Sequence, residues 1–150
     1  MKKYKFTGEE KLMFGRTLKR IRAAIDFGNV KAGDIGGWIE KESNLSQMGS
    51  AWVSGDAQVS GDAGVYGNAQ VYGGEWEKSP CYIQGTRWAI NISSNDTVQC
   101  GCQNHTWQEW HDRYLEISNA HDADDVLEEY IRYFNLLCDM YGHADCRIER

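Results

Sequence analysis

The sequence lacks long apolar segments and has few cysteines and prolines. None of its 150 residues lies in an apolar run of about 18 residues, so no membrane span is expected. Its basic beginning has no apolar stretch of the kind that a secretory signal requires, so we expect no signal peptide. The five cysteines are an odd number, which argues against a disulfide framework and favours a reducing cytoplasm. The single proline, Pro80, indicates a break in the chain.

An overall positive charge is also missing. The formal net charge is −6 at pH 7, which disfavours general binding to nucleic acid. The charge is unevenly spread, because residues 1–50 hold ten lysines and arginines against six acidic residues, whereas residues 51–150 hold six against sixteen. An anionic ligand or an acidic partner would therefore prefer the first third of the chain. The alternative is that these cations only solvate a hairpin.

The middle of the chain contains a six-residue repeat. Valine marks one phase of the repeat and alanine a second phase, at Val53, Val59, Val65 and Val71 and at Ala57, Ala63 and Ala69. Each repeat also contains a glycine, and in the first three this glycine is followed by Asp or Asn, a pair that suits tight corners. A period of six is typical of short strands joined by corners. We expect the valines and alanines to point inward.

The repeat resembles that of hexapeptide-repeat left-handed β-helices, in which three units form one triangular coil. Ile39 and Leu45 extend the register upstream, if two residues near Gln47 loop out. The six units then predict about two coils. Both ends of so short a stack need caps, from the flanking sequence or from other subunits.

We therefore predict a mainly β protein with C-terminal helices. A short left-handed β-helix of about two coils would be capped by an N-terminal β-hairpin and by a C-terminal β-hairpin plus a two-helix unit. The corresponding regions are residues 1–35, 36–76 and 77–150, within one compact domain overall. The expected strands outside the repeat are Tyr4–Gly8, Arg16–Ala24, Tyr82–Gln84, Thr86–Ile92 and Thr97–Cys102.

Two amphipathic helices are expected near the end of the chain. Thr106 and Glu109 form a capping box that begins the first helix. Asp122 is expected to cap a second helix over residues 123–141, which ends at Gly142. The short link between the two helices predicts an antiparallel pair.

Cysteines and histidines give only weak indications of chemistry. Cys100, Cys102 and His105 could bind a metal, but the C-x-C spacing and the scatter of other donors do not suit a zinc site. No feature of the sequence activates a particular cysteine as a nucleophile. Long hexapeptide stacks often belong to acyltransferases that use a histidine base, but all four histidines lie outside this short repeat. We expect no catalytic residue, metal or cofactor.

Two arginines and four aromatic residues are the candidate ligand-binding residues. Arginine can hold a phosphate through two hydrogen bonds, and aromatic rings can stack on bases. The repeat phases predict that three of the aromatics, Trp52, Tyr66 and Tyr72, point away from the core. The alternative is that they cover the stack or a subunit contact. The full set is Arg20, Arg22, Trp38, Trp52, Tyr66 and Tyr72.

Three runs of the sequence are similar to small phage and prophage-encoded hexapeptide-repeat proteins. They are the run GRTLKRIRA at residues 15–23, the run VKAGDIGGWIEKESNLS at 30–46 and the run QCGCQNHTWQEW at 99–110. The resemblance implies a short accessory protein of a bacteriophage, which would act in the cytoplasm of the host cell. It brings no catalytic residues that could be assigned here.

From these observations we expect a non-enzymatic binding protein that counters host defence. It would sequester a small nucleotide-derived immune signal in a pocket of a homo-oligomer, such as a trimer. One alternative is an inhibitor of a host defence protein, acting through acidic residues of the helix pair: Asp122, Asp124, Asp125, Glu128 and Glu129. A further alternative is a hexapeptide-repeat acyltransferase.

Overall fold

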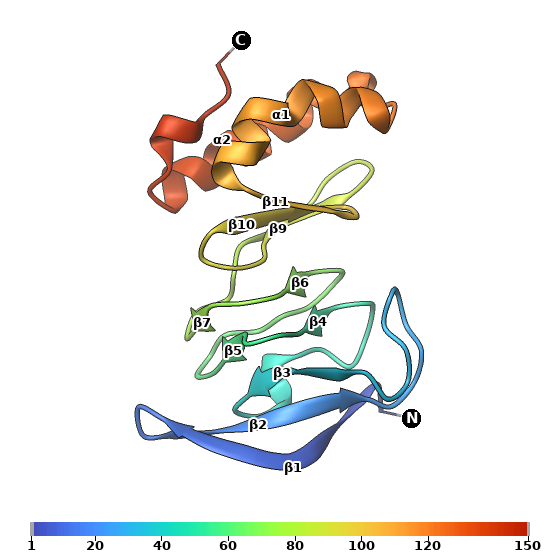
Figure 1. Ribbon diagram of the computed structural model, residues 1–150, viewed down its shortest axis with the longest axis vertical. Helices are drawn as coiled ribbons and strands as arrows, with labels where there is room; N and C mark the ends of the chain where they lie inside the picture. The colour runs from blue at the N-terminus through green and yellow to red at the C-terminus, as the bar shows by residue number, and fades with distance from the viewer. Residues whose placement is uncertain (1, 150) are drawn as a thin grey trace. The chain divides into compact units, whose positions relative to one another are not determined.

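The computed structural model describes residues 2–149 and is mainly β, with two helices near the C-terminal end (Figure 1). This confirms the predicted class of mainly β with C-terminal helices. The chain divides into two compact units: the first contains the chain up to Pro80 together with Ser93–Asn95, and the second contains Cys81–Ile92 and the chain from Asp96 onward. The predicted N-terminal and repeat regions thus fall in the same unit.

An antiparallel hairpin begins the first unit. Strand β1 (Tyr4–Met13) pairs with β2 (Arg16–Ala23), and a register shift interrupts the pairing between Phe6 and Glu10. The connecting residues Phe14 and Gly15 have φ values of 49° and 80°, the left-handed backbone that a two-residue hairpin turn requires. The strand that was expected to end at Gly8 therefore continues to this turn. Strand β3 (Ile35–Ile39) adds antiparallel to β2.

The six-residue repeat forms parallel pairs between segments three repeat units apart. Strand β3 pairs with β5 (Gln58–Val59), which pairs with β7 (Glu75–Trp76). Strand β4 (Trp52–Val53) pairs with β6 (Gln70–Val71), and Leu45 forms a single parallel bridge with Val65. A short 3-10 turn, η1 (Glu42–Asn44), precedes Leu45. Successive repeat units therefore belong to different sets of parallel pairings, here called ladders. Each ladder contains every third unit.

The repeat supplies the core of the first unit. The four valines Val53, Val59, Val65 and Val71 are at most 2% exposed, and the three alanines Ala57, Ala63 and Ala69 are at most 3% exposed, which confirms that both phases point inward. Burial of one such valine stabilises the fold by roughly 1.5–3 kcal/mol. The corners at Gly55, Gly61 and Gly67 have φ near 60°, where a side chain would be strained.

The second unit has a four-stranded antiparallel sheet in the order β11-β10-β9-β8. Strand β8 has the predicted bounds, whereas β9 begins three residues later than expected. The predicted strand 97–102 ends two residues early, because Gly101 has a φ of 56° and turns the chain between β10 and β11. The strand bounds are β8 (Tyr82–Gln84), β9 (Ala89–Ile92), β10 (Thr97–Cys100) and β11 (Gln103–Thr106).

Helix α1 (Trp107–Ala120) begins at the predicted capping box. The Glu109 amide donates to Thr106 Oγ1 at 3.1 Å, and the Thr106 amide donates to Glu109 Oε1 at 2.9 Å. This arrangement satisfies two amides that would otherwise lack partners at the start of the helix. A side-chain acceptor at position 106 thus fixes where α1 starts.

Helix α2 (Leu127–Met140) begins later than predicted, after a 3-10 turn, η2 (Asp124–Val126). The prediction that Asp122 caps this helix is wrong, because Asp122 has a φ of 50° and belongs to the turn that closes α1. The end of α2 is as predicted: Gly142 has a φ of 80°, and the His143 amide donates to the Cys138 carbonyl at 2.8 Å. A last 3-10 turn, η3 (Ala144–Cys146), follows.

Aromatic contacts join the elements of the second unit. The ring of Trp107, at the start of α1, lies 5.9 Å from Phe134 and 6.3 Å from Tyr141, near the end of α2. The two helices therefore run antiparallel. Tyr130 of α2 reaches the sheet, where its ring is 5.7 Å from Trp88. Within residues 2–149, no helix is both long and apolar enough to cross a membrane.

Candidate functional site

Two cations converge on one tryptophan ring in the first unit. Arg20 and Trp38 are register partners on β2 and β3, and the Arg20 Cζ atom is 5.3 Å from the centre of the Trp38 ring. Lys11 Nζ, from β1, is 4.3 Å from the same ring centre. We call Lys11, Arg20 and Trp38 the Trp38 cluster. The antiparallel pairing of three strands brings these residues together from separate parts of the sequence.

The Trp38 cluster is held in place and remains partly accessible. Arg20 Nε donates to the Gly36 carbonyl at 3.1 Å, and the Arg20 guanidinium lies 3.9 Å from the Glu9 carboxylate. The Arg20 side chain is 30% exposed, and Trp38 is half-buried. Cations near an indole face are stabilised by the ring quadrupole. The same groups can also bind phosphate oxygens and stack on a planar ring.

Lys11 was missed by the sequence analysis. The first strand was expected to end at Gly8, which left Lys11 outside any expected strand, just before the turn region expected at residues 12–15. Strand β1 instead extends to Met13 and places Lys11 opposite Leu18 of β2. A hairpin with a two-residue turn at Phe14–Gly15 would have indicated the longer strand, since the register of a hairpin follows from its turn.

Trp52 is not an exposed aromatic, so it is not accessible to a ligand, contrary to the prediction, and its burial fits the alternative that it covers the stack. It is 5% exposed, and its ring lies edge-to-face with that of Phe27 at 5.3 Å. The indole also lies against Gly36, where an added Cβ atom would be 2.7 Å from Trp52 Cζ2. The loop that carries Phe27, closed by its pairing with Val30, thus covers Trp52.

The remaining predicted residues are exposed but do not join the Trp38 cluster within one chain. Arg22 pairs in register with Ile35, beyond the irregularity in the β2–β3 ladder. Tyr66 and Tyr72 are 52% and 41% exposed, as the repeat phases predict. They follow the valines that pair with Leu45 and Val53, and so belong to different ladders from Trp38.

The cysteines and histidines of the second unit offer little for metal binding or nucleophilic attack. Burial raises the pKa of the Cys100 thiol to about 12, so this group stays protonated near neutral pH. Donor atoms of His143, Asp145 and Cys146 lie within 4.8 Å of one another. Burial also raises the pKa of the Cys146 thiol, which opposes the thiolate that a zinc site uses.

Some of the acidic residues near the start of α2 have partners inside the second unit. Arg87 forms an ion pair with Asp125 at 3.2 Å. The Glu129 carboxylate accepts hydrogen bonds from the Thr86 amide at 2.8 Å and from the Tyr133 hydroxyl at 2.6 Å. These contacts secure the loop between β8 and β9 against α2. They reduce the free negative charge that a basic partner surface could meet.

No model of a protein family matches this chain, and no curated protein matches it.

Proposed function

We propose that the protein is a non-enzymatic binding protein whose Trp38 cluster holds a small anionic ligand of the nucleotide class. The observation that carries this proposal is the convergence of Lys11 and Arg20 on one half-buried indole. A nucleotide offers both a phosphate for the cations and a planar base for the ring. The excess of lysine and arginine within residues 1–50 adds a favourable long-range field.

We further propose that the three parallel ladders are the faces of a short left-handed β-helix of about two coils, with β1 and β2 as a cap. In such a prism, residues on different ladders point to different sides. Tyr66 and Tyr72 could then meet a Trp38 cluster only on a neighbouring subunit. A homo-oligomer, such as a trimer, would complete the pocket between subunits and cover the exposed tyrosines.

The proposed role is to counter host defence by sequestering a nucleotide-derived immune signal in the host cytoplasm. It rests on the resemblance of the sequence to phage-encoded repeat proteins. Inhibition of a host protein through the acidic residues of the helix pair is the alternative, although Asp125 and Glu129 already have partners in the second unit. Acyl transfer is less well supported, because every histidine of the sequence lies beyond the repeat.

Isothermal titration calorimetry of the full chain tests the proposal. The ligands are ADP-ribose, a cyclic ADP-ribose and a cyclic dinucleotide, each titrated at low salt. We expect at least one to bind, and Lys11→Ala combined with Arg20→Ala to weaken it by roughly tenfold or more, since charge-assisted hydrogen bonds contribute about 1.5–3 kcal/mol each. Trp38→Ala should weaken binding as well.

Arg22→Ala is the matched control, because it removes the same charge from the same strand without touching the Trp38 ring. We expect it to change the affinity much less than Arg20→Ala. Equal binding by the wild type and the Lys11/Arg20 double variant would overturn the proposed site. Native mass spectrometry of the same samples gives the number of subunits and any ligand that the purified protein retains.

A further inference from the structure

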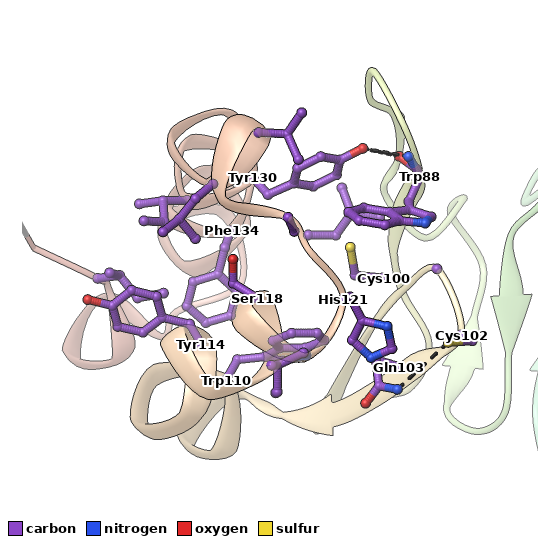
Figure 2. A pocket seen from close by; sticks show the side chains of 18 residues that line it. Trp88, Cys100, Cys102, Gln103, Trp110, Tyr114, Ser118, His121, Tyr130 and Phe134 are labelled. Atoms are coloured by element: carbon purple, nitrogen blue, oxygen red, sulfur yellow. Dashed lines mark hydrogen bonds between the residues drawn. The ribbon is translucent and has the colours of Figure 1, made fainter.

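The second unit contains a cavity between its sheet and its two helices (Figure 2). Its volume is about 110 Å³, and its walls are almost entirely apolar. Aromatic rings form much of the lining: Trp88 from the sheet side, Trp110 and Tyr114 from α1, and Tyr130 and Phe134 from α2. All of these residues belong to the second unit, so this cavity is separate from the Trp38 cluster.

One polar group in the cavity wall has no partner. Ser118 is 7% exposed, and its hydroxyl makes no hydrogen bond with any residue that the structure describes. A serine in a helix can bond to a carbonyl of the preceding turn, but this hydroxyl does not. Figure 2 shows Ser118 among the side chains that line the cavity. An unpaired buried hydroxyl lowers stability, so a ligand that paired with it would remove this cost.

The position of Ser118 is fixed by its backbone. Its carbonyl accepts hydrogen bonds from the amides of His121 and Ala123, at 3.2 and 3.0 Å, and these bonds close the C-terminal end of α1. These bonds fix the backbone from which the Ser118 side chain projects in the cavity wall. A polar atom in an apolar cavity is the arrangement that orients a small ligand.

The rest of the wall favours a neutral ligand. Cys100 lines the cavity from the sheet side, and burial raises the pKa of its thiol to about 12, which keeps it protonated. Among the lining residues that the structure describes, none is a lysine, arginine, aspartate or glutamate. Two residues of the lining, Cys102 and His121, are exposed, which leaves a route from solvent. An anion or a cation would lose its hydration here without gaining an opposite charge.

We infer that this cavity is a binding site for a neutral molecule with a single aromatic ring and one hydrogen-bonding substituent, of the phenol class. At about 110 Å³ the cavity is smaller than the engineered apolar cavity of about 150 Å³ that binds benzene, so a single ring is the upper limit of what it can hold. The surrounding aromatic side chains offer edge and face contacts to such a ring. The substituent pairs with the Ser118 hydroxyl. This site does not depend on nucleotide binding by the first unit.

Titration of the ¹⁵N-labelled full chain, followed by amide and indole NMR shifts, tests the inference. The probes are phenol, benzene and cyclohexanol, which separate the ring from the hydroxyl. We expect saturable shifts at Ser118 and at the Trp88 and Trp110 indoles, with phenol binding about fivefold more tightly than benzene, the effect of one net hydrogen bond. Cyclohexanol should bind more weakly than phenol.

Two variants and a control complete the test. Ser118→Ala should bring phenol to the affinity of benzene and leave benzene unchanged. Ala123→Leu should fill the cavity and abolish both, whereas Ala120→Leu, the same change at an exposed position outside the lining, should retain both. Phenol binding that equals benzene binding in the wild type would overturn the inference without any variant. Retention of phenol affinity in Ser118→Ala or Ala123→Leu, or the lack of saturable shifts, would also overturn it.

Discussion

The two units of this protein are built from different kinds of sequence. In the first unit, small aliphatic residues at regular spacing pack into a core in which the repeat valines are almost completely buried. In the second unit, large aromatic residues without a repeat join a sheet to two helices and leave a cavity. In the repeat, identical small side chains stack on one another and fill the interior. In the second unit, large aromatic rings at irregular positions leave the cavity between the sheet and the helices unfilled.

The largest expected effect comes from a charge in the core of the first unit. Val59 is fully buried between its ladder partners Ile39 and Trp76. Val59→Asp would bury an unpaired carboxylate, so we expect a loss of about 4 kcal/mol or more in the free energy of unfolding. Urea denaturation followed by circular dichroism measures it. Gln58→Asp, at the neighbouring half-buried position, should cost much less, and equal losses would show that Val59 does not face inward.

In the second unit, the largest loss of stability is expected when the hydroxyl oxygen of Tyr130 is removed. The Tyr130 hydroxyl donates to the Trp88 carbonyl at 2.7 Å and accepts from the Trp88 amide at 2.6 Å. Tyr130→Phe leaves both backbone groups without this partner, so we expect a loss of about 2–3 kcal/mol in denaturant unfolding. Tyr133→Phe removes a hydroxyl that binds only the Glu129 side chain, and should cost less than about 1 kcal/mol. A similar loss in both variants would contradict this account of the sheet–helix contact.

A buried lysine makes the stability of the first unit depend on pH. Lys3 is 2% exposed, and burial lowers its pKa from 10.5 to about 8, although Nζ donates to the Ala51 carbonyl at 2.8 Å. Below pH 8 both the folded and the unfolded chain hold the proton. Between about pH 8 and 10.5 the unfolded chain binds it more tightly, so stability rises with pH in this window.

The rise should be about 2–3 kcal/mol, since each unit of pKa difference corresponds to about 1.4 kcal/mol, and it should disappear in Lys3→Met. Chemical denaturation at several pH values from 7 to 10.5 measures it. Lys5→Met, which removes a neighbouring exposed lysine, is the control and should keep the rise. A profile for Lys3→Met that parallels the wild type would show that Lys3 is not the responsible group.

The smallest effect is expected at the corners of the repeat. Gly61 has a φ of 59°, and Gly61→Ala would strain the backbone, so we expect a loss of about 1 kcal/mol. Gly64, three residues later, has ordinary backbone angles and open space for a Cβ atom, with no atom nearer than 3.8 Å. Thermal unfolding should show little change for Gly64→Ala. The opposite order would contradict the assignment of Gly61 to a corner.

The sequence predicts the parts of the molecule that depend on local or periodic rules. The six-residue spacing indicates which valines are buried, and the Thr106–Glu109 pair indicates where α1 begins. The start of α2 was misplaced, because Asp122 closes the turn after α1 in a left-handed conformation, which Asp adopts more often than most non-glycine residues.

Contacts between distant segments could not be predicted in the same way. Lys11 joins Arg20 and Trp38 only because β1 extends beyond the strand Tyr4–Gly8 that the sequence predicted. Trp52 is covered by a loop whose path depends on the pairing of Phe27 with Val30. The cavity around Ser118 depends on side chains from two helices and a sheet, and no spacing in the sequence brings them together.

The central claim is that units three repeats apart, and not consecutive units, lie side by side. Interstrand nuclear Overhauser effects on a uniformly labelled sample test it most directly. The structure predicts backbone contacts between Val53 and Val71 and between Ile39 and Val59. Contacts between Val53 and Val59, or between Val59 and Val65, in place of these would mean that the repeat folds back as a simple meander, and would contradict the account.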